Sequence, residues 1–443
     1  MKSNKEGETK VKDKTRKKGQ VLGCVADDFT GASDAASFLQ KAGMHTLLIN
    51  EVQKDILIPE DTDAIVIALK SRTQETRAAV HDTLGAMEWL KDQGATKLYF
   101  KYCSTFDSTR EGNIGPVADA ILAYLEQPYT VLCPSLPVNG RVVKEGRLYV
   151  KGEPLDESPM RNHPLTPMWD SRIKNLIEAQ SAYQAAELFR DRLEIGKGEL
   201  KEWLDGQSPM GEHFYVIPDY VDEQDGENIV RLFGGLTFLT GGSGLLEPLA
   251  LSMRREAGDE KRASLIQRAK NLRPGVVLAG SCSVATLAQI RDYQKRGGVS
   301  LQIDPMALLK GEQTAEDILD FILQRSDQEI LIYSSDEADK VREVQKSGRA
   351  RIAKAIEETL SRVATELVRQ GYGRIVVAGG ETSGAVTKAL GFAAFEIGPS
   401  VAPGVPVMTP LENREIRLVL KSGNFGQEDF FTRALCMTKG EKL

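Results

Sequence analysis

Apolar segments that end in a glycine- or aspartate-containing loop and then continue into a helical pattern recur along this chain. Val21–Ala26 runs into Asp27-Asp28-Phe29-Thr30-Gly31, and Arg374–Ala378 runs into Gly379-Gly380-Glu381-Thr382-Ser383-Gly384. Strands that alternate with helices in this way are typical of mainly parallel sheets flanked by helices. The sequence therefore predicts an α/β fold.

The alternation falls into two runs, and a chain of 443 residues is long enough for two to three domains of about 150 residues each. A Pro- and Gly-rich stretch at 137–170, with a hairpin near Gly146–Gly152, interrupts the first run. We expect two domains, each with a mainly parallel sheet flanked by helices, and an active site in the cleft between them. The predicted boundaries are a disordered basic arm at 1–20, an N-terminal domain at 21–249, a helical connection at 250–274 and a C-terminal domain at 275–443.

The charge is unevenly distributed along the chain. The net charge is 57 − 63 = −6, but residues 1–20 hold eight basic and three acidic residues, which leaves 49 − 60 = −11 for the remainder. This balance argues against a nucleic-acid partner. No apolar run approaches the ~18 residues of a membrane-spanning helix, so no membrane partner is expected. The sequence leaves open whether the protein forms a homodimer.

Cysteine usage indicates the redox compartment. The five cysteines include no C-x-x-C pair, which suits a reduced, cytoplasmic protein better than a disulfide framework. No histidine with recognisable spacing accompanies them, so a nucleophilic thiol is disfavoured. We predict small, buried structural positions for Cys24, Cys103, Cys133 and Cys282.

Two adjacent carboxylates, Asp27 and Asp28, follow the first predicted strand. Ligands of open parallel sheets bind beyond the carboxyl ends of the strands. The pair is therefore a candidate to bind a polyol, hold Mg²⁺ or act as a base. The alternative is that an aspartate simply caps the next helix.

A polar segment after the third predicted strand combines cations, hydroxyls and an acid. It reads Lys101-Tyr102-Cys103-Ser104-Thr105-Phe106-Asp107-Ser108-Thr109-Arg110. Cations suit a carboxylate and hydroxyls suit alcohol groups, so the inventory fits a hydroxy-acid ligand. A solvated turn is the alternative. Arg141, Arg161 and His163 are candidates to complete such a pocket.

Glycine-rich loops follow strands at Leu236–Leu246, Val276–Ala288 and Ile375–Leu390, and Ser422–Gly426 adds a fourth. Glycine lets backbone N–H groups approach an anion, and the following helix contributes unpaired N–H groups and the positive end of its dipole. These loops are candidate phosphate cradles, although they match neither the Walker nor the dinucleotide-binding signature. Glu381 is either a Mg²⁺ ligand or an acid favoured at a helix start.

The ordered motifs resemble those of the four-carbon acid sugar kinases from Val21 to about Leu435. This resemblance implies an N-terminal acid-sugar domain, a C-terminal nucleotide domain and ATP with Mg²⁺ as cosubstrate. The motifs are Ala26-Asp27-Asp28-Phe29-Thr30-Gly31-Ala32, Thr240-Gly241-Gly242-Ser243-Gly244, Gly280-Ser281-Cys282-Ser283, Ala378-Gly379-Gly380-Glu381-Thr382-Ser383-Gly384 and Lys421-Ser422-Gly423-Asn424-Phe425-Gly426.

The resemblance implies roles for individual residues. We expect an aspartate, Asp28 first and Asp107 second, to orient or deprotonate the terminal hydroxyl of the sugar acid. The resemblance implies that Glu381 binds the metal. The candidate substrate residues are Asp27, Lys101, Ser104, Thr105, Arg141, Arg161 and His163, and the candidate ATP residues are Ser281, Ser283, Gly379, Gly380, Glu381, Thr382 and Gly423.

Within the family, the segments 101–109, 112–117 and 163–168 look most like the branch that phosphorylates the 4-hydroxyl of 3-oxo-tetronate. D-threonate or D-erythronate phosphorylation is the near alternative. More distant ones are an NAD-dependent acid-sugar dehydrogenase and a non-catalytic sensor of nucleotide or sugar acid. The chain departs from the family pattern at Val407-Met408, where we expect Trp-Thr, and at Val142, where we expect Thr.

Overall fold

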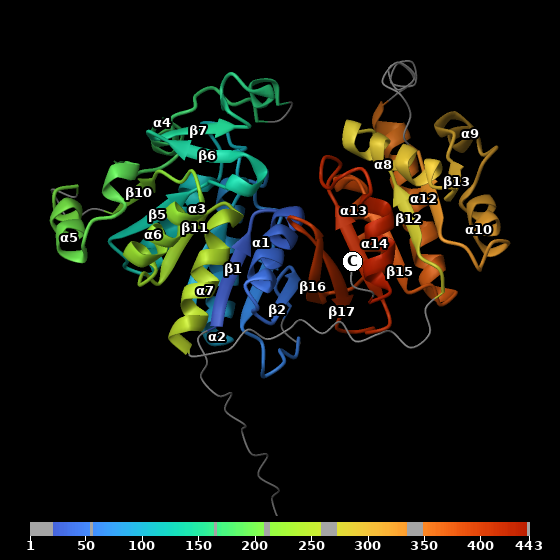
Figure 1. The fold of residues 1–443 in the computed structure, drawn as a ribbon, viewed down its shortest axis with the longest axis horizontal. Coiled ribbons are helices and arrows are strands. Elements are labelled where there is room, and N and C mark those ends of the chain that lie inside the picture. The colour runs from blue at the N-terminus through green and yellow to red at the C-terminus, as the bar shows by residue number, and fades with distance from the viewer. Residues whose placement is uncertain are drawn as a thin grey trace, which may run out of the picture.

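The computed structural model describes residues 21–53, 56–163, 166–207, 213–257, 273–334 and 349–440. Figure 1 shows two α/β halves side by side, with the N-terminal half in blue to green and the C-terminal half in orange to red. The predicted α/β class with two domains is confirmed. The predicted basic arm at 1–20 and residues 258–272 of the predicted connection lie outside the described residues.

The N-terminal half alternates strands and helices around a buried central strand, in which all six residues are buried. The first helix has nine successive buried residues, most of them Ala, Ser or Gly, and such small side chains let a helix lie close to the sheet. Its elements are β1 Val21–Ala26, α1 Phe29–Lys41, β2 Thr46–Asn50, β3 Ala64–Ala68, α2 Thr76–Asp92, β4 Ala95–Lys101, α3 Ile114–Tyr124, β5 Tyr129–Cys133, η1 Pro137–Asn139, β6 Arg141–Lys144, β7 Arg147–Val150, β8 Glu153–Pro154, η2 Pro159–Asn162, α4 Ile173–Glu178, β9 Gln184–Leu188, η3 Arg190–Arg192, α5 Lys197–Asp205, β10 Phe214–Pro218, α6 Glu223–Phe233, β11 Phe238–Gly241, η4 Ser243–Leu245 and α7 Leu246–Ala257.

The C-terminal half repeats the alternation and ends in a strand and a helix. Its long amphipathic helix packs against its neighbours over the sheet. Its elements are β12 Val276–Ala279, α8 Val284–Lys295, β13 Val299–Gln302, α9 Pro305–Lys310, α10 Ala315–Leu323, β14 Ile330–Tyr333, α12 Arg349–Arg369, β15 Arg374–Ala378, α13 Gly380–Leu390, β16 Ala394–Ala402, β17 Val405–Pro410, β18 Arg417–Lys421 and α14 Phe430–Thr438.

One 15-stranded sheet runs through both halves in the order β13-β14-β12-β15-β18-β17-β16-β2-β3-β1-β4-β11-β5-β10-β9. The sequence did not predict that the two sheets join. The joint is the antiparallel pairing of β16 with β2, in which Ala394 faces Ile49, and the β16–β17 hairpin then leads to β18. The register of β16 shifts on either side of Ser400, and such irregularities bend a strand.

A three-stranded sheet of β6, β7 and β8 lies outside the main sheet, within the stretch that we expected to be irregular with one hairpin. A hairpin is present but begins earlier than the predicted Gly146–Gly152: Arg141 pairs with Val150 and Lys144 with Arg147. A bridge between Val143 and Tyr220 attaches it to the segment after β10. In the part of the chain that the structure describes, no helix has the length and apolar character needed to cross a membrane.

The predicted positions of the cysteines are confirmed in part. Cys24 and Cys133 are buried and Cys103 is half-buried, and burial raises the pKa of Cys24 and Cys133 to about 12 and that of Cys103 to about 11. These thiols are therefore poor nucleophiles. The prediction of burial is wrong for Cys282, which is exposed in the loop between β12 and α8.

Candidate active site

Four neighbouring parallel strands, β3, β1, β4 and β11, end at the same edge of the sheet. Asp27 follows β1 at this edge and is buried, and both of its carboxylate oxygens accept hydrogen bonds of 2.8 Å from Arg72. Arg72 follows β3 and was not among the predicted site residues, since a single arginine after a strand carries no motif. Because Arg72 donates to both oxygens, the role of Asp27 at this edge is to hold the guanidinium in place.

One carboxylate oxygen of Asp28 has a structural role, and the other is available. Its Oδ1 accepts a hydrogen bond from the backbone N–H of Gly31 at 2.7 Å, which caps α1 as the capping alternative predicted, and lies 3.1 Å from Arg72. Its side chain is 32% exposed, against 5% for Asp27. Within the described ranges no hydrogen bond reaches Oδ2. Asp28 therefore has one fixed oxygen and one available oxygen.

Lys101, the last residue of β4, is buried beside this pair. A Cβ on Gly31 would lie 2.3 Å from Asp28 Oδ1 and 2.5 Å from Lys101 Nζ, so only glycine fits between them. Burial lowers the pKa of Lys101, but the charges of Asp34, Asp28 and Asp27 outweigh it and raise the pKa above its ordinary value. Among the described residues its ammonium forms no hydrogen bond or ion pair, so its three donors remain for a ligand.

Asp34, on the second turn of α1, is a buried acid that the sequence analysis missed. Its Oδ2 accepts a hydrogen bond from Ser243, which follows β11, and its Oδ1 is buried without a partner in the described structure. Burial raises the pKa of Asp34, whereas the charges of Lys101 and Arg141 lower it. The predicted Arg141 therefore lies close enough to affect the same cluster.

The loop after β4 holds a strained backbone turn. Thr105 is buried and donates to Asp107 Oδ1 at 2.6 Å, and Cys103 Sγ lies 3.0 Å from the same hydroxyl. Between them the buried Phe106 adopts a positive φ of 54°, which costs energy in a residue with a side chain. Packing against Tyr102, with ring centroids 5.6 Å apart, holds it there. Asp107 is half-buried at the end of this turn.

The remaining predicted substrate residues differ in position. Ser104 borders the cluster, since a Cβ on Gly242 would lie 3.4 Å from Ser104 Cβ. Arg161 is exposed on η2, and His163 Nδ1 accepts a hydrogen bond from the backbone N–H of Thr166 at 3.1 Å. No contact found in the described ranges joins Arg161 or His163 to Lys101, so their part in the site stays a prediction.

The predicted nucleotide loops converge at the carboxyl ends of β12, β15 and β18, which are parallel neighbours. Ser283 caps α8 and donates to the carbonyl of Gly423 at 2.6 Å. A Cβ on Gly423 would lie 2.4 Å from Ser281 Oγ and 3.0 Å from Ser283 Oγ. The two serines and Gly423 are thus packed together without room for a side chain at Gly423.

The β15 loop completes this arrangement. Gly379 has a φ of +129°, a conformation that requires glycine, and its N–H donates to the carbonyl of Lys421 at 2.9 Å. A Cβ on Gly280 would lie 2.2 Å from Oγ1 of the buried Thr382. Gly380, the first residue of α13, has no atom within 4 Å of its Cβ position. Backbone N–H groups at a glycine-rich helix start form an anion site.

Glu381 lies exposed in the first turn of α13, close enough to Glu357 on α12 for its charge to act on that acid. Burial raises the pKa of Glu357, and the nearby charges of Glu381 and Glu358 raise it further. No cluster of three or more His, Cys, Asp or Glu with metal-binding geometry occurs in the part of the chain that the structure describes. Two neighbouring carboxylates near an anion loop suit a hard divalent cation that is held largely by water and phosphate.

The sugar-side and nucleotide-side clusters meet at the turn of the β16–β17 hairpin. Gly404 in this turn has a φ of +80°. A Cβ there would lie 2.3 Å from Asp34 Oδ1 and 3.1 Å from a ring carbon of Phe425, which belongs to the loop after β18. In Figure 1, α1 and the hairpin lie between the two halves of the molecule. The hairpin therefore brings together two sites that are far apart in the sequence.

Comparisons with known proteins agree with this two-part site. Residues 22–249 match a sugar-binding N-terminal domain, and residues 276–431 match a nucleotide-binding C-terminal domain. A sugar-binding domain joined to a nucleotide-binding domain defines a two-domain sugar kinase. The chain belongs to the four-carbon acid sugar kinase family.

Curated relatives cover nearly the whole chain. The 3-oxo-tetronate kinase of Cupriavidus necator is 41% identical over 429 residues, which cover 94% of this chain and 96% of the relative. The 3-oxo-tetronate kinase of Haemophilus influenzae is 39% identical and covers 94% of this chain and 99% of the relative. A solved structure from Salmonella typhimurium LT2 superposes with a TM-score of 0.84 at 38% identity, over 93% of this chain and 98% of that chain.

Proposed function

We propose that this protein is a 3-oxo-tetronate kinase, which transfers the γ-phosphoryl group of ATP to the 4-hydroxyl of 3-oxo-tetronate and releases ADP. Family membership and relatives of this name at 39–41% identity over nearly the full length support it. The observation that carries the proposal is the meeting at Gly404 of a lysine-containing polar cluster and a set of glycine-rich anion loops. In this proposal residues 21–249 bind the acid sugar and residues 275–443 bind the nucleotide.

Lys101 holds the carboxylate of the sugar acid in this proposal. Its buried ammonium has no partner among the described residues and keeps its charge, since Asp34, Asp28 and Asp27 raise its pKa. A charge-assisted hydrogen bond to a carboxylate is among the strongest available at such an edge. Arg141 assists from β6, and the hydroxyls of Ser104 and Thr105 serve the alcohol groups of the substrate.

Asp28 acts on the terminal hydroxyl. Its Oδ1 is held by Gly31 and Arg72, so Oδ2 is presented in a fixed direction and accepts the proton that the hydroxyl loses. Asp107 also has one oxygen engaged, by Thr105, so Asp28 ranks first because it adjoins Arg72 and its charge acts on Lys101. Phosphoryl transfer needs little covalent work from the protein, so positioning of this hydroxyl against the γ-phosphate is the main task.

The nucleotide phosphates lie, in this proposal, against the N–H groups of Gly379, Gly380 and Gly423 and against Ser281, Ser283 and Thr382. Mg²⁺ fits beside them, because the exposed Glu381 and the half-buried Glu357 place carboxylates near the anion loop. When bound, Mg²⁺ neutralises charge on the phosphate oxygens. The chain's own groups orient the triphosphate and shield it from water.

A coupled assay of ADP release tests this function. Purified protein with Mg²⁺ and ATP is given 3-oxo-tetronate, D-threonate or D-erythronate separately. We expect the highest kcat/KM with 3-oxo-tetronate. Higher kcat/KM with D-threonate or D-erythronate would assign the protein to the other branch, and ATP binding without turnover of any of the three would favour a sensor.

The variant Asp28→Asn tests the proton acceptor. It keeps the shape of the cap but removes the charge, so we expect kcat to fall by about 10²–10⁴-fold while ATP affinity is retained. The matched control is Asp82→Asn, an exposed aspartate on α2. Normal turnover of the Asp28 variant would remove Asp28 from the mechanism.

A further inference from the structure

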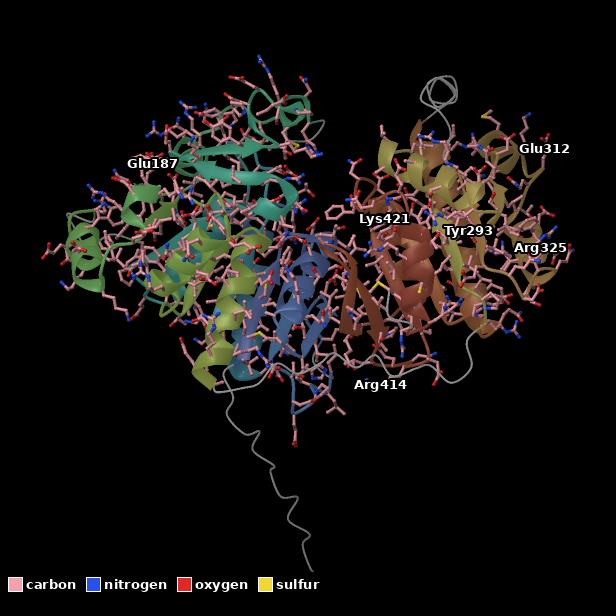
Figure 2. The ribbon with its side chains drawn as sticks, in the orientation of Figure 1. Glu187, Tyr293, Glu312, Arg325, Arg414 and Lys421 are labelled. Atoms are coloured by element: carbon pink, nitrogen blue, oxygen red, sulfur yellow. The ribbon has the colours of Figure 1, made fainter. Side chains whose placement is uncertain are left out.

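Lys421, the last residue of β18, connects the three nucleotide loops. Its Nζ donates to Oγ1 of Thr286 on α8 at 3.1 Å, to the carbonyl of Gly423 at 2.9 Å and to the carbonyl of Phe425 at 3.1 Å. Its own carbonyl accepts the N–H of Gly379 at 2.9 Å. One residue thus ties the start of α8, the β15 loop and the β18 loop together. Figure 2 labels Lys421 in the C-terminal half, above Arg414, which precedes the start of the same strand.

The ammonium of Lys421 is surrounded by neutral oxygens. Its side chain is 1% exposed, and no carboxylate forms an ion pair with it among the described residues. In the part of the chain that the structure describes, the ring of Phe430 adds a charge-stabilising contact, with its centroid 5.4 Å from Nζ. A buried cation without a counter-charge is costly, so a fold that keeps a lysine at such a position in a binding loop points to a ligand of opposite charge.

Burial lowers the pKa of Lys421 from its ordinary 10.5 to about 7. No ion pair joins Lys421 to a titratable group on the elements packed around it. These groups are Cys282 in the loop before α8, Arg291, Asp292 and Lys295 on α8, Glu381 and Lys388 on α13, Asp429 just before α14 and Arg433 on α14.

We propose that Lys421 is a positioning residue whose charge is balanced by the bound nucleotide rather than by the protein. It stands behind the loops. In its charged form, with nucleotide bound, it holds them in one cradle through three hydrogen bonds and supplies a positive charge beneath the triphosphate. Electrostatic attraction across a dry loop is stronger than across water. This inference rests on the proposed nucleotide site and adds to it a charged residue that does not need to touch the phosphate.

Proton uptake on ATP binding is the direct consequence. At about pH 8 most of the unliganded protein carries a neutral Lys421, since its pKa is about 7. A bound polyanion favours the charged form, so ATP binding takes up as much as about one proton. A residue that only braces the loops would produce no such uptake.

Calorimetric titration of Mg²⁺·ATP into the full-length protein measures this uptake from the dependence of the binding heat on buffer ionisation. The variants are Lys421→Met, which removes charge and donors, and Lys421→Gln, which keeps amide donors without charge. The control is Lys388→Met, an exposed lysine on α13. Circular dichroism confirms that each variant is folded.

We expect ATP affinity to fall about ten- to a hundredfold in Lys421→Met, since hydrogen bonds and charges of this kind contribute that much. Lys421→Gln should lose the proton uptake and regain only part of the affinity, and Lys388→Met should match the wild type. Wild-type ATP binding without proton uptake, or full affinity in Lys421→Gln, overturns the inference. Failure of the wild type to bind ATP overturns instead the proposed nucleotide site.

Discussion

In each half of the molecule a strand of the sheet ends in a buried lysine, and the surroundings of these two lysines differ. Lys101 closes β4 among three aspartates, which raise its pKa although burial lowers it. Lys421 closes β18 among carbonyls and a hydroxyl, and burial lowers its pKa to about 7. Lys101 has free donors and a compensated charge, whereas Lys421 has occupied donors and an uncompensated charge.

The comparison shows how a buried lysine at the end of a strand can serve either of two anions. A lysine with unused donors is suited to bind a carboxylate directly, which requires contact. A lysine with all donors used acts at short range through its charge and through the loops that it holds. The first is expected to recognise the sugar acid and the second to support the nucleotide. Four predictions test this contrast and the joint between the halves, in order of decreasing expected effect.

Lys101→Met should have the largest effect. It removes the cation that meets the carboxylate and takes away a positive charge that acts on Asp34 and Asp28, so kcat/KM should fall by roughly 10²- to 10³-fold or more. ATP affinity should change little. Steady-state kinetics and nucleotide titration measure the two effects, with Lys70→Met, an exposed lysine that follows β3, as the control. Equal losses of sugar and ATP binding would contradict the contrast.

The stability of the unliganded protein should depend on pH through Lys421. Its pKa is about 7 in the folded protein against 10.5 ordinarily, so between these values the unfolded chain binds more protons. Stability then rises with pH, and the wild type should gain about 1–2 kcal/mol over Lys421→Met between about pH 7 and pH 9. Urea unfolding at each pH measures the difference. A constant difference would show that Lys421 is charged in both states.

Gly404→Ala should loosen the contact between the halves. The new Cβ would lie 2.3 Å from Asp34 Oδ1, and the φ of +80° is unfavourable for alanine. We expect the free energy of unfolding to fall by about 1–3 kcal/mol and kcat to fall with it. Gly391→Ala is the control, since Gly391 has a φ of +69° and nothing near its Cβ position. Similar kinetics in both variants would limit the effect to backbone strain.

Alkylation of Cys282 should report nucleotide occupancy. This thiol is exposed between Ser281 and Ser283, whereas Cys24 and Cys133 are buried with raised pKa values. Bound ATP should therefore slow its reaction with N-ethylmaleimide a few-fold or more by covering the loop. Mass spectrometry of the labelled peptide follows the rate, and the acid sugar alone should not protect. Protection by the acid sugar alone would place Cys282 on the other side of the site.

Much of the site follows from local patterns. The strands that precede Asp27 and Gly379 and those that contain Lys101 and Lys421 were each predicted from an apolar segment and its following loop, and parallel strands bring their carboxyl ends to one edge. Residues without a local motif were missed. Arg72 contacts Asp27, 45 residues away, and Asp34 contacts Ser243, 209 residues away.

The sequence by itself determined the α/β class, the two sets of loops and the family, because strand–loop–helix units and glycine motifs are local. The tertiary structure decided that β2 pairs with β16, that one sheet unites both halves and that Gly404 stands between Asp34 and Phe425. It also decided that Lys101 and Lys421 are both buried but differently compensated. Pairing and burial depend on residues that are distant in the chain, so no local pattern contains them.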